Sequence, residues 1–319
     1  MLRLLAGKFV RLLVVLFVVT FGTFMLVRLF PGDPVKKMIP YGTNLEEQRA
    51  RLRGEIGLDQ PALTQYGSWL RGLASGDLGT IYPSRTPVSE VLRSAAPVTL
   101  QLILYAQVLA LLVAIPLGVF TAYRAGTWFD RVSSASAFGL LAIPSFVLGL
   151  YLAYFVGARW QWLPAGQYVK FGTDPVEHFR SMVLPTISLA AGQIALYMRL
   201  LRSDMIDTLQ ESFVKTARSK GLSNRRILWR HALRPSSLTL LTFAGLSIGT
   251  LVGGAVVVET VFALPGLGTE IYKAIIGQQY VALQSYVALI AIGYVLVNFT
   301  VDLLYTVLDP RIRHGRVAA

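Results

Sequence analysis

The sequence has no cysteine among its 319 residues, and only 15% of those residues are charged. The absence of cysteine excludes a disulfide framework and a thiolate metal site, although it says nothing about the cellular compartment. The small share of charge argues against a soluble domain of this length, because such a domain needs a charged surface in water. The sequence also lacks a glycine-rich loop followed by Lys and Ser or Thr, the motif that cradles nucleotide phosphates. We therefore expect no catalytic residue, no metal ligand and no nucleotide-hydrolysing site on this chain.

Long apolar runs are present instead, since hydrophobic residues make up 54% of the sequence. Runs near 20 residues match the length that a helix needs to cross about 30 Å of hydrocarbon. The candidate spans are Phe9–Leu29, Ala96–Tyr123, Val132–Ala158, Met182–Leu201, Leu238–Ala263 and Val281–Leu308. This pattern predicts an all-α, polytopic membrane protein with six transmembrane helices.

The spans divide the chain into a first transmembrane helix at 1–30, an extracytoplasmic segment at 31–95, a five-helix core at 96–308 and a tail at 309–319. We expect the segment 31–95 to form short helices packed on the outer face, because it is too long for a simple turn. The core contains one sizeable cytoplasmic loop, residues 202–235.

The positions of Lys and Arg predict the orientation in the membrane. The net charge is +13, and eight Lys and Arg residues lie in loop 202–235, whereas loop 264–280 has only Lys273. Because short cytoplasmic loops carry the excess of positive charge, both termini and the tail 309–319 are expected to be cytoplasmic. The basic residues follow the ends of the apolar runs and are not gathered with aromatics on one domain. Membrane topology therefore explains them better than an anchor for a nucleic-acid complex, which is a weaker alternative.

The span interiors hold few titratable side chains. The second and third spans have none, and the fifth has none from Leu238 until Glu259. A proton-driven carrier needs such groups at membrane depth. Sodium coupling at broken helices stays possible because Pro116 and Pro144 interrupt spans, but we expect both prolines only to kink their helices. Any driving energy is therefore expected to enter from outside the membrane.

Polar, uncharged side chains do occur within or beside the spans, among them Gln107, Gln193, Ser247 and Thr250. Most such groups hydrogen-bond between helices in a membrane, because hydrocarbon offers them no partner. We expect this role for most of them here, and a few are expected to line a path.

Loop 202–235 has a helical pattern of its own. Met205, Leu209, Phe213 and Ala217 recur near helical spacing, with charges on the other faces. Gly221 fits the end of this helix, and Ser223 or Asn224 fits the N-cap of a second, basic helix that returns to the membrane. The pattern is compatible with an interfacial helix on anionic lipid and with a docking helix for a cytoplasmic partner.

Two motifs then resemble a known family. Lys215-Thr-Ala-Arg-Ser-Lys-Gly221 resembles the EAA loop of ABC importer permeases, in which Glu-Ala-Ala is followed by Gly after three residues. Lys215 and Thr216 replace the first two residues of that motif, while Ala217 and Gly221 match it. The segment Glu259-Thr-Val-Phe-Ala-Leu-Pro-Gly-Leu-Gly268 is similar to the signature after the fifth span of dipeptide and oligopeptide permeases.

Other stretches match the same family in the same order. They are Gly57-Leu-Asp-Gln-Pro with Gln65-Tyr, Trp69 and Gly76-Asp-Leu-Gly79, and the ending from Asp302 to Arg313. The resemblance covers nearly the whole chain. It implies the type I ABC importer permease fold in a bacterial inner membrane, and a role in the uptake of dipeptides or oligopeptides. Glutathione, nickel chelates and haem are alternative substrates within this family, and an ion-coupled carrier is a less favoured reading.

The resemblance also implies partners and site residues. The partners are a second homologous permease subunit, two cytoplasmic ATPase subunits or a fused pair, an extracytoplasmic substrate-binding protein and membrane lipid, with no nucleic acid. No cofactor is implied on this chain, because ATP and Mg²⁺ bind to the ATPase subunits. The residues implied to couple to the ATPase are Glu211, Phe213, Ala217, Arg218, Gly221 and Leu222. The signature residues at the outer end of span five are Glu259, Phe262, Pro265, Gly266 and Gly268. Glu259 would meet the binding protein or a peptide amine, or else brace its own loop.

Overall fold

A computed structural model of the chain describes residues 2–28, 35–36 and 44–308. Predictions that fall on residues 29–34, 37–43 and 309–319 lie outside these ranges. The described residues are helical almost throughout, as the sequence predicts. Two short strands, β1 (Thr80–Ile81) and β2 (Thr86–Pro87), form an antiparallel hairpin, and loops such as residues 160–174 join the helices.

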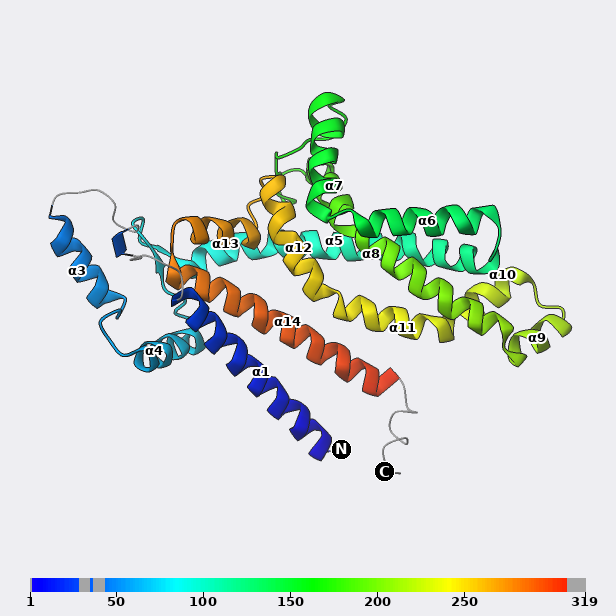
Figure 1. Cartoon of the computed structure of the whole chain (residues 1–319), viewed down its shortest axis with the longest axis horizontal. Coiled ribbons are helices and arrows are strands. Elements are labelled where there is room, and N and C mark those ends of the chain that lie inside the picture. Colours follow the sequence, from blue (N-terminus) through cyan, green and yellow to red (C-terminus); the bar gives the residue numbers. More distant parts are fainter. Residues whose placement is uncertain (1, 29–34, 37–43, 309–319) are drawn as a thin grey trace. The chain divides into compact units, whose positions relative to one another are not determined.

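The chain folds into two compact units, one formed by residues 1–98 and 265–319 and the other by residues 99–264. The elements of the first unit are α1 (Leu2–Arg28), α3 (Leu45–Glu55), α4 (Ala62–Ser75), the hairpin, the start of α5 (Val88–Tyr123), α13 (Leu267–Ile276) and α14 (Tyr280–Leu308). Helices α1 and α14 pack side by side (Figure 1). The core of this unit is apolar and includes Leu78, Val88, Ile271, Ala282 and Tyr286.

Tyr66 is central to the packing of helix α4 on α1. The ring of Tyr66 meets the rings of Phe17, Phe21 and Phe24 edge-on, with ring centroids 5.3 to 6.3 Å apart. Its hydroxyl shares a hydrogen bond of 2.9 Å with the hydroxyl of Thr20. Edge-to-face aromatic pairs and a satisfied hydroxyl allow a buried tyrosine to join two helices firmly. The short helices predicted for segment 31–95 are therefore present within its described part, as α3 and α4.

The second unit is organised around α8 (Pro175–Gln210). Its other elements are the rest of α5, α6 (Trp128–Ala142), α7 (Ser145–Leu152), the π-helical η1 (Ala153–Arg159), α9 (Ser212–Ser219), α10 (Asn224–Arg226), the π-helical η2 (Ile227–Ala232), α11 (Leu233–Leu246) and α12 (Ile248–Val261). Helices α6, α7, α11 and α12 all pack against α8. At 36 residues α8 is about 54 Å long. It therefore extends well beyond the predicted span Met182–Leu201 at both ends.

Three described helices are long and apolar enough to cross a membrane, namely α5, α8 and the part Tyr280–Thr300 of α14. Two further candidates are bent pairs, α6 with α7–η1 and α10–α11 with α12. Helix α1 contains a shorter apolar segment, Leu12–Met25. The described residues thus hold three to five candidate spans where the sequence predicts six, because two of the predicted helices are broken and the apolar part of α1 is short.

The first break corrects the predicted third span, Val132–Ala158. This segment is not one helix, since α6 and α7 meet at an angle of 97° (Figure 1). The break falls at Ile143 and Pro144, which are both extended, with ψ of 118° and 141°. Proline lacks an N–H group and pushes the residue before it out of the helical region. The expectation that Pro144 only kinks its helix is wrong, whereas Pro116 does lie inside a continuous α5.

The second break corrects the predicted fifth span, Leu238–Ala263. Helices α11 and α12 meet at Ser247 with a bend of 46°. The hydroxyl of Tyr197 on α8 forms hydrogen bonds there with Ser247 and, at 3.1 Å, with the side-chain oxygen of Gln107 on α5. The amide of Gln193 likewise donates to the hydroxyl of Thr250 at 3.1 Å. The expectation that polar span residues bond between helices is therefore confirmed for these side chains.

Candidate functional site

The segment 202–235 is built differently from the predicted loop. Residues 202–210 continue α8, and the backbone becomes extended at Glu211, with φ of −63° and ψ of 152°. Helix α9 then starts at Ser212. Met205 is completely buried on α8, so it does not share an exposed amphipathic helix with Phe213. The prediction of one helix through both residues is wrong because the chain turns between them.

The turn after α9 agrees with the sequence. Gly221 has a φ of +75°, a conformation that glycine adopts without steric cost. Its N–H donates to the carbonyl of Arg218 at 2.9 Å, which closes the last turn of α9. Ser223 is extended and precedes α10, and its carbonyl accepts from the N–H of Ile227 at 3.0 Å. The predicted order of helix, glycine turn and second helix is therefore confirmed, with Ser223 at the N-cap.

A small apolar cluster holds this helical turn together. Val214, Ala217 and Ile227 are buried, and Leu209 and Leu222 pack against them. Burial of this apolar surface stabilises the turn between α9 and α10. Two residues implied to contact an ATPase, Ala217 and Leu222, therefore contribute first to the fold of the segment itself.

The opposite face of α9 is exposed and mostly basic. Phe213 is 44% exposed, and the side chains of Glu211 and Arg218 are also exposed. Lys215 and Lys220 are exposed as well. An exposed aromatic ring suits a protein groove, and exposed cations suit an anionic lipid surface. Of the implied coupling residues, Glu211, Phe213, Arg218 and Gly221 are thus exposed to a partner.

Contacts tie the segment to three long helices. The amide of Asn224 donates to the hydroxyl of Tyr123 at the end of α5, at 3.0 Å. The ring of Trp229 meets Phe120 of α5 edge-on, with centroids 6.3 Å apart. Ser236 of α11 donates to the hydroxyl of Thr208 on α8 at 2.8 Å. Asn224 thus ties α10 to α5, helix α9 packs against α8, and Ser236 and Thr208 tie α11 to α8.

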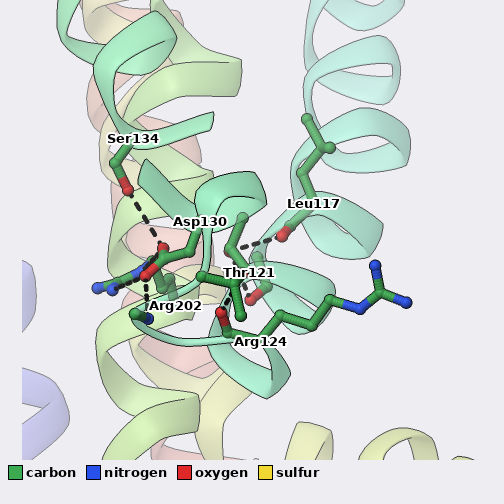
Figure 2. Close-up of polar contacts among 9 residues, drawn as sticks. Leu117, Thr121, Arg124, Asp130, Ser134 and Arg202 are labelled. Atoms are coloured by element: carbon green, nitrogen blue, oxygen red, sulfur yellow. Dashed lines mark hydrogen bonds and ion pairs between the residues drawn. The ribbon is translucent and has the colours of Figure 1, made fainter. Parts of the chain in front are cut away.

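A buried ion pair fixes the start of the segment. Figure 2 shows Arg202 of α8 in a two-pronged contact with Asp130 of α6, at 2.6 and 2.8 Å. The carboxylate also accepts from the N–H of Gly126 at 2.8 Å and from Ser134 at 3.4 Å. The side chain of Asp130 is only 5% exposed. With every lone-pair direction of the carboxylate occupied, this pair can hold α6 against α8.

Sequence reasoning missed Asp130 because it lies just before the predicted third span. A signal was present, since Asp130 is the only acidic residue between Glu90 and Asp174. The same helices are joined a second time, where the guanidinium of Arg199 lies 4.0 Å from the centre of the Phe138 ring. A cation over an aromatic face adds attraction to the ion pair.

Sequence reasoning also missed His178, the buried histidine near the start of α8. It is completely buried, and its ring nitrogens contact the carbonyl of Val169 at 2.7 Å and the hydroxyl of Tyr105 at 3.1 Å. With both nitrogens occupied, His178 braces the loop that precedes α8. Within the described ranges, no group of three or more potential metal ligands occurs.

The signature residue Glu259 is completely buried on α12. Its carboxylate accepts a hydrogen bond of 2.5 Å from the hydroxyl of Thr99 on α5, and its carbonyl accepts from the N–H of Leu264 at 2.9 Å. Phe262 is also buried, at 1% exposure. In this structure the buried carboxylate of Glu259 is placed to brace the end of its helix.

The remaining signature residues lead into α13. Pro265 is exposed, and Gly266 and Gly268 are buried. Gly266 is extended, with ψ of 177°, and precedes the first turn of α13. The signature therefore marks the end of one helix and the start of the next.

Two family models match the sequence. The model described as "Binding-protein-dependent transport system inner membrane component" matches residues 114–314. The model described as "Binding-prot-dependent transport system membrane comp, N-term" matches residues 1–103. Together the matches extend over most of the chain, including the α9–α10 segment and the Asp130–Arg202 pair.

Similar proteins align over nearly the full length. A putative peptide transport system permease protein of Brucella abortus is 36% identical over 98% of this chain and 100% of its own. A probable peptide ABC transporter permease of Sinorhizobium fredii is 35% identical over 96% of this chain and 98% of its own. The dipeptide transport system permease protein DppB of Escherichia coli is 36% identical over 93% of this chain and 95% of its own.

Proposed function

The chain belongs to the family of binding-protein-dependent transport system inner membrane components, and from this premise we propose that it imports dipeptides or oligopeptides. It is a multi-pass permease of the inner membrane and a non-catalytic component of its transporter. The peptide substrate is supported by the names of its relatives, at about a third identity over their whole length. The choice among peptides would rest largely with the binding protein.

In this proposal the chain forms half of the translocation pathway beside a second, homologous permease. Two ATPase subunits or a fused pair bind from the cytoplasm, where both termini lie. A substrate-binding protein delivers the peptide from outside. Proteins of this family act with ATPase and binding-protein subunits, so this chain would bind neither ATP nor Mg²⁺ itself.

The α9–α10 segment would couple the ATPases to the pathway. The observation that carries this step is the combination of an exposed aromatic residue and exposed basic residues with contacts of α10 to α5 and of α9 to α8. Closure of the ATPases on ATP would displace the segment and bias the helices between two arrangements. ATP can shift the equilibrium between the two arrangements only as far as it favours one of them. Contacts between the segment and the ATPases would supply that preference.

Replacement of Phe213 by alanine tests the coupling role. We expect peptide uptake by the complete importer, and the ATP hydrolysis that the loaded binding protein stimulates, to fall by about tenfold, as for loss of an aromatic anchor. The matched control is Phe243→Ala on α11, since Phe243 has a similar exposure of 39% against 44% and lies outside the segment. Both variants should reach the membrane in normal amounts, because neither ring is buried.

The coupling role would be wrong if Phe213→Ala and Phe243→Ala gave equal uptake. If the segment instead lies on the lipid surface, uptake by the importer should depend on anionic lipid. Phe213→Ala should then leave the stimulated ATP hydrolysis unchanged. A competition experiment separates the possible substrates. It measures uptake by the same importer of a dipeptide, glutathione, a nickel chelate and haem, each in the presence of the others.

A further inference from the structure

A cavity of about 430 Å³ lies within the unit formed by residues 1–98 and 265–319. Its walls come from the end of α1, the turn after α3, helix α4, the β-hairpin and the start of α14. This volume is in the range of sites that take small molecules. The coupling segment and the signature of α12 contribute nothing to it.

One wall of the cavity carries a cation without a counter-ion. The guanidinium of Arg28 lies 4.2 Å from the centre of the Phe24 ring and donates to the side-chain oxygen of Gln65. Within the described part of the chain, no carboxylate forms an ion pair with it. A guanidinium offers five N–H donors in a planar fork, so Arg28 keeps donors for a planar anion.

A second donor lines the same cavity. Gln284 of α14 is 7% exposed, and its side-chain nitrogen has no hydrogen-bond partner in the described structure. Buried amide nitrogens nearly always have an acceptor, so an unpartnered one calls for a partner that is not part of the described chain. Arg28 and Gln284 both require an acceptor, which a carboxylate provides.

Other groups of the cavity carry the opposite charge. Glu55 and Asp77 both line it. The carboxylate of Asp77 accepts from the N–H of Gly79 at 3.0 Å, and that of Glu55 is 3.4 Å from the hydroxyl of Tyr82. Tyr82 and Trp69 add aromatic walls. A cavity that holds both signs of charge and aromatic surface suits a zwitterion with apolar side chains more than a simple anion.

We infer that this cavity binds a short peptide, with its C-terminal carboxylate on Arg28 and Gln284 and its ammonium group toward Glu55. The inference rests on the proposed function, because the importer must meet peptides on the side where this unit would lie. Stretches that carry the sequence resemblance, around Gly57, Gln65 and Gly79, line the same cavity. Those residues lie outside the coupling segment, and peptide binding at this cavity would give them a role.

The test uses the complete permease–ATPase complex in nanodiscs, without the binding protein. The probe is radiolabelled alanyl-phenylalanine, measured by equilibrium binding. We expect Arg28→Met and Gln284→Leu each to weaken binding by about tenfold, the effect of losing a hydrogen bond to a charged group. Arg28→Lys, which keeps the charge, should bind better than Arg28→Met. The matched control Arg71→Met should bind normally, since Arg71 is an exposed residue of α4 that does not line the cavity.

A second arm separates a peptide from other ligands with an oxyanion. The C-terminal amide of the same dipeptide should bind about tenfold more weakly than the acid. Equal binding of acid and amide, or equal binding by Arg28→Met and Arg71→Met, would overturn the inference. Dipeptide binding is also measured in nanodiscs that contain increasing amounts of phosphatidylethanolamine. Displacement of the dipeptide by this lipid would overturn the inference and assign the cavity to a lipid headgroup.

Uptake by the complete importer distinguishes the two proposals. Uptake of dipeptides together with no binding at the cavity would remove this inference and leave the proposed function intact. Binding at the cavity together with no uptake of any peptide would remove the proposed function. Each variant is first checked for assembly with its ATPases, so that a misfolded chain is not scored as a loss of binding.

Discussion

At the scale of single residues, the ion pair between Asp130 and Arg202 gives the first prediction. Asp130→Asn keeps the size of the side chain but removes the charge that Arg202 faces at 2.6 and 2.8 Å. We expect a loss of about 1–3 kcal/mol in the free energy of unfolding, at the level of a hydrogen bond to a charged group, because Arg202 is 28% exposed and partly solvated. Thermal unfolding in detergent measures this.

The control for this prediction is Asp207→Asn, because Asp207 is an exposed residue of the same long helix α8. It should unfold at the temperature of the unchanged protein. Arg202→Lys should resemble Asp130→Asn, since a lysine cannot make the two-pronged contact. Equal unfolding temperatures for Asp130→Asn and Asp207→Asn would show that the pair does not hold α6 against α8.

Residues whose role is local could be predicted from the sequence, and residues whose role depends on a distant partner could not. Gly221 and Ser223 are placed as predicted, because a helix end and a helix start are set by neighbouring residues. Asp130 and His178 were missed, since their partners lie 72 and 73 residues away along the chain. The contact between Glu259 and Thr99 could not be predicted for the same reason, since these residues lie 160 positions apart.

At the scale of elements, the sequence predicts where apolar helices lie and not where they bend. Pro116 and Pro144 both interrupt apolar runs, yet only the run with Pro144 breaks. Close packing follows the break at Pro144. Gly149 of α7 is so close to α8 and α12 that an added Cβ would lie 3.3 Å from Phe262 and 3.4 Å from Ser188. Such contacts stabilise the bent path, and they depend on residues far along the chain.

The turn between α9 and α10 is the element on which the coupling proposal depends, and Gly221 tests it. Its φ of +75° is unfavourable for a β-branched residue, whereas asparagine tolerates this conformation. An added Cβ would meet nothing within 4 Å, so backbone strain is the main effect expected. We expect Gly221→Val to lose most peptide uptake and Gly221→Asn to keep it, with both chains present in the membrane in normal amounts.

Uptake assays with the complete importer measure the difference between these variants, and Gly221→Asn serves as the matched control. Because the two substitutions are of comparable size, a difference between them reports on the turn and not on bulk. Uptake by Gly221→Val at the level of Gly221→Asn would mean that the turn does not transmit force from the ATPases.

At the scale of the whole molecule, the buried carboxylates of the described residues bear on how transport could be driven. The buried carboxylic side chains in the described part of the chain are Asp130 and Glu259. Asp130 is held by Arg202, and Glu259 accepts from Thr99. A proton carrier needs a group that is released to each side of the membrane in turn. Both carboxylates are instead held by partners within the unit of residues 99–264, so neither is arranged for that exchange.

We therefore expect vesicles that hold only this polypeptide to accumulate no dipeptide under a proton or sodium gradient. Vesicles that hold the complete importer, with ATP on the side of the ATPases, should accumulate it when loaded binding protein is added outside. Glu259→Gln sharpens the test, because the amide oxygen can still accept from Thr99 but the side chain can no longer titrate. Uptake by the complete importer should survive this substitution, whereas a carrier driven through Glu259 would stop. Accumulation by the isolated chain under an ion gradient would show that the energy enters through the spans and not through the α9–α10 segment.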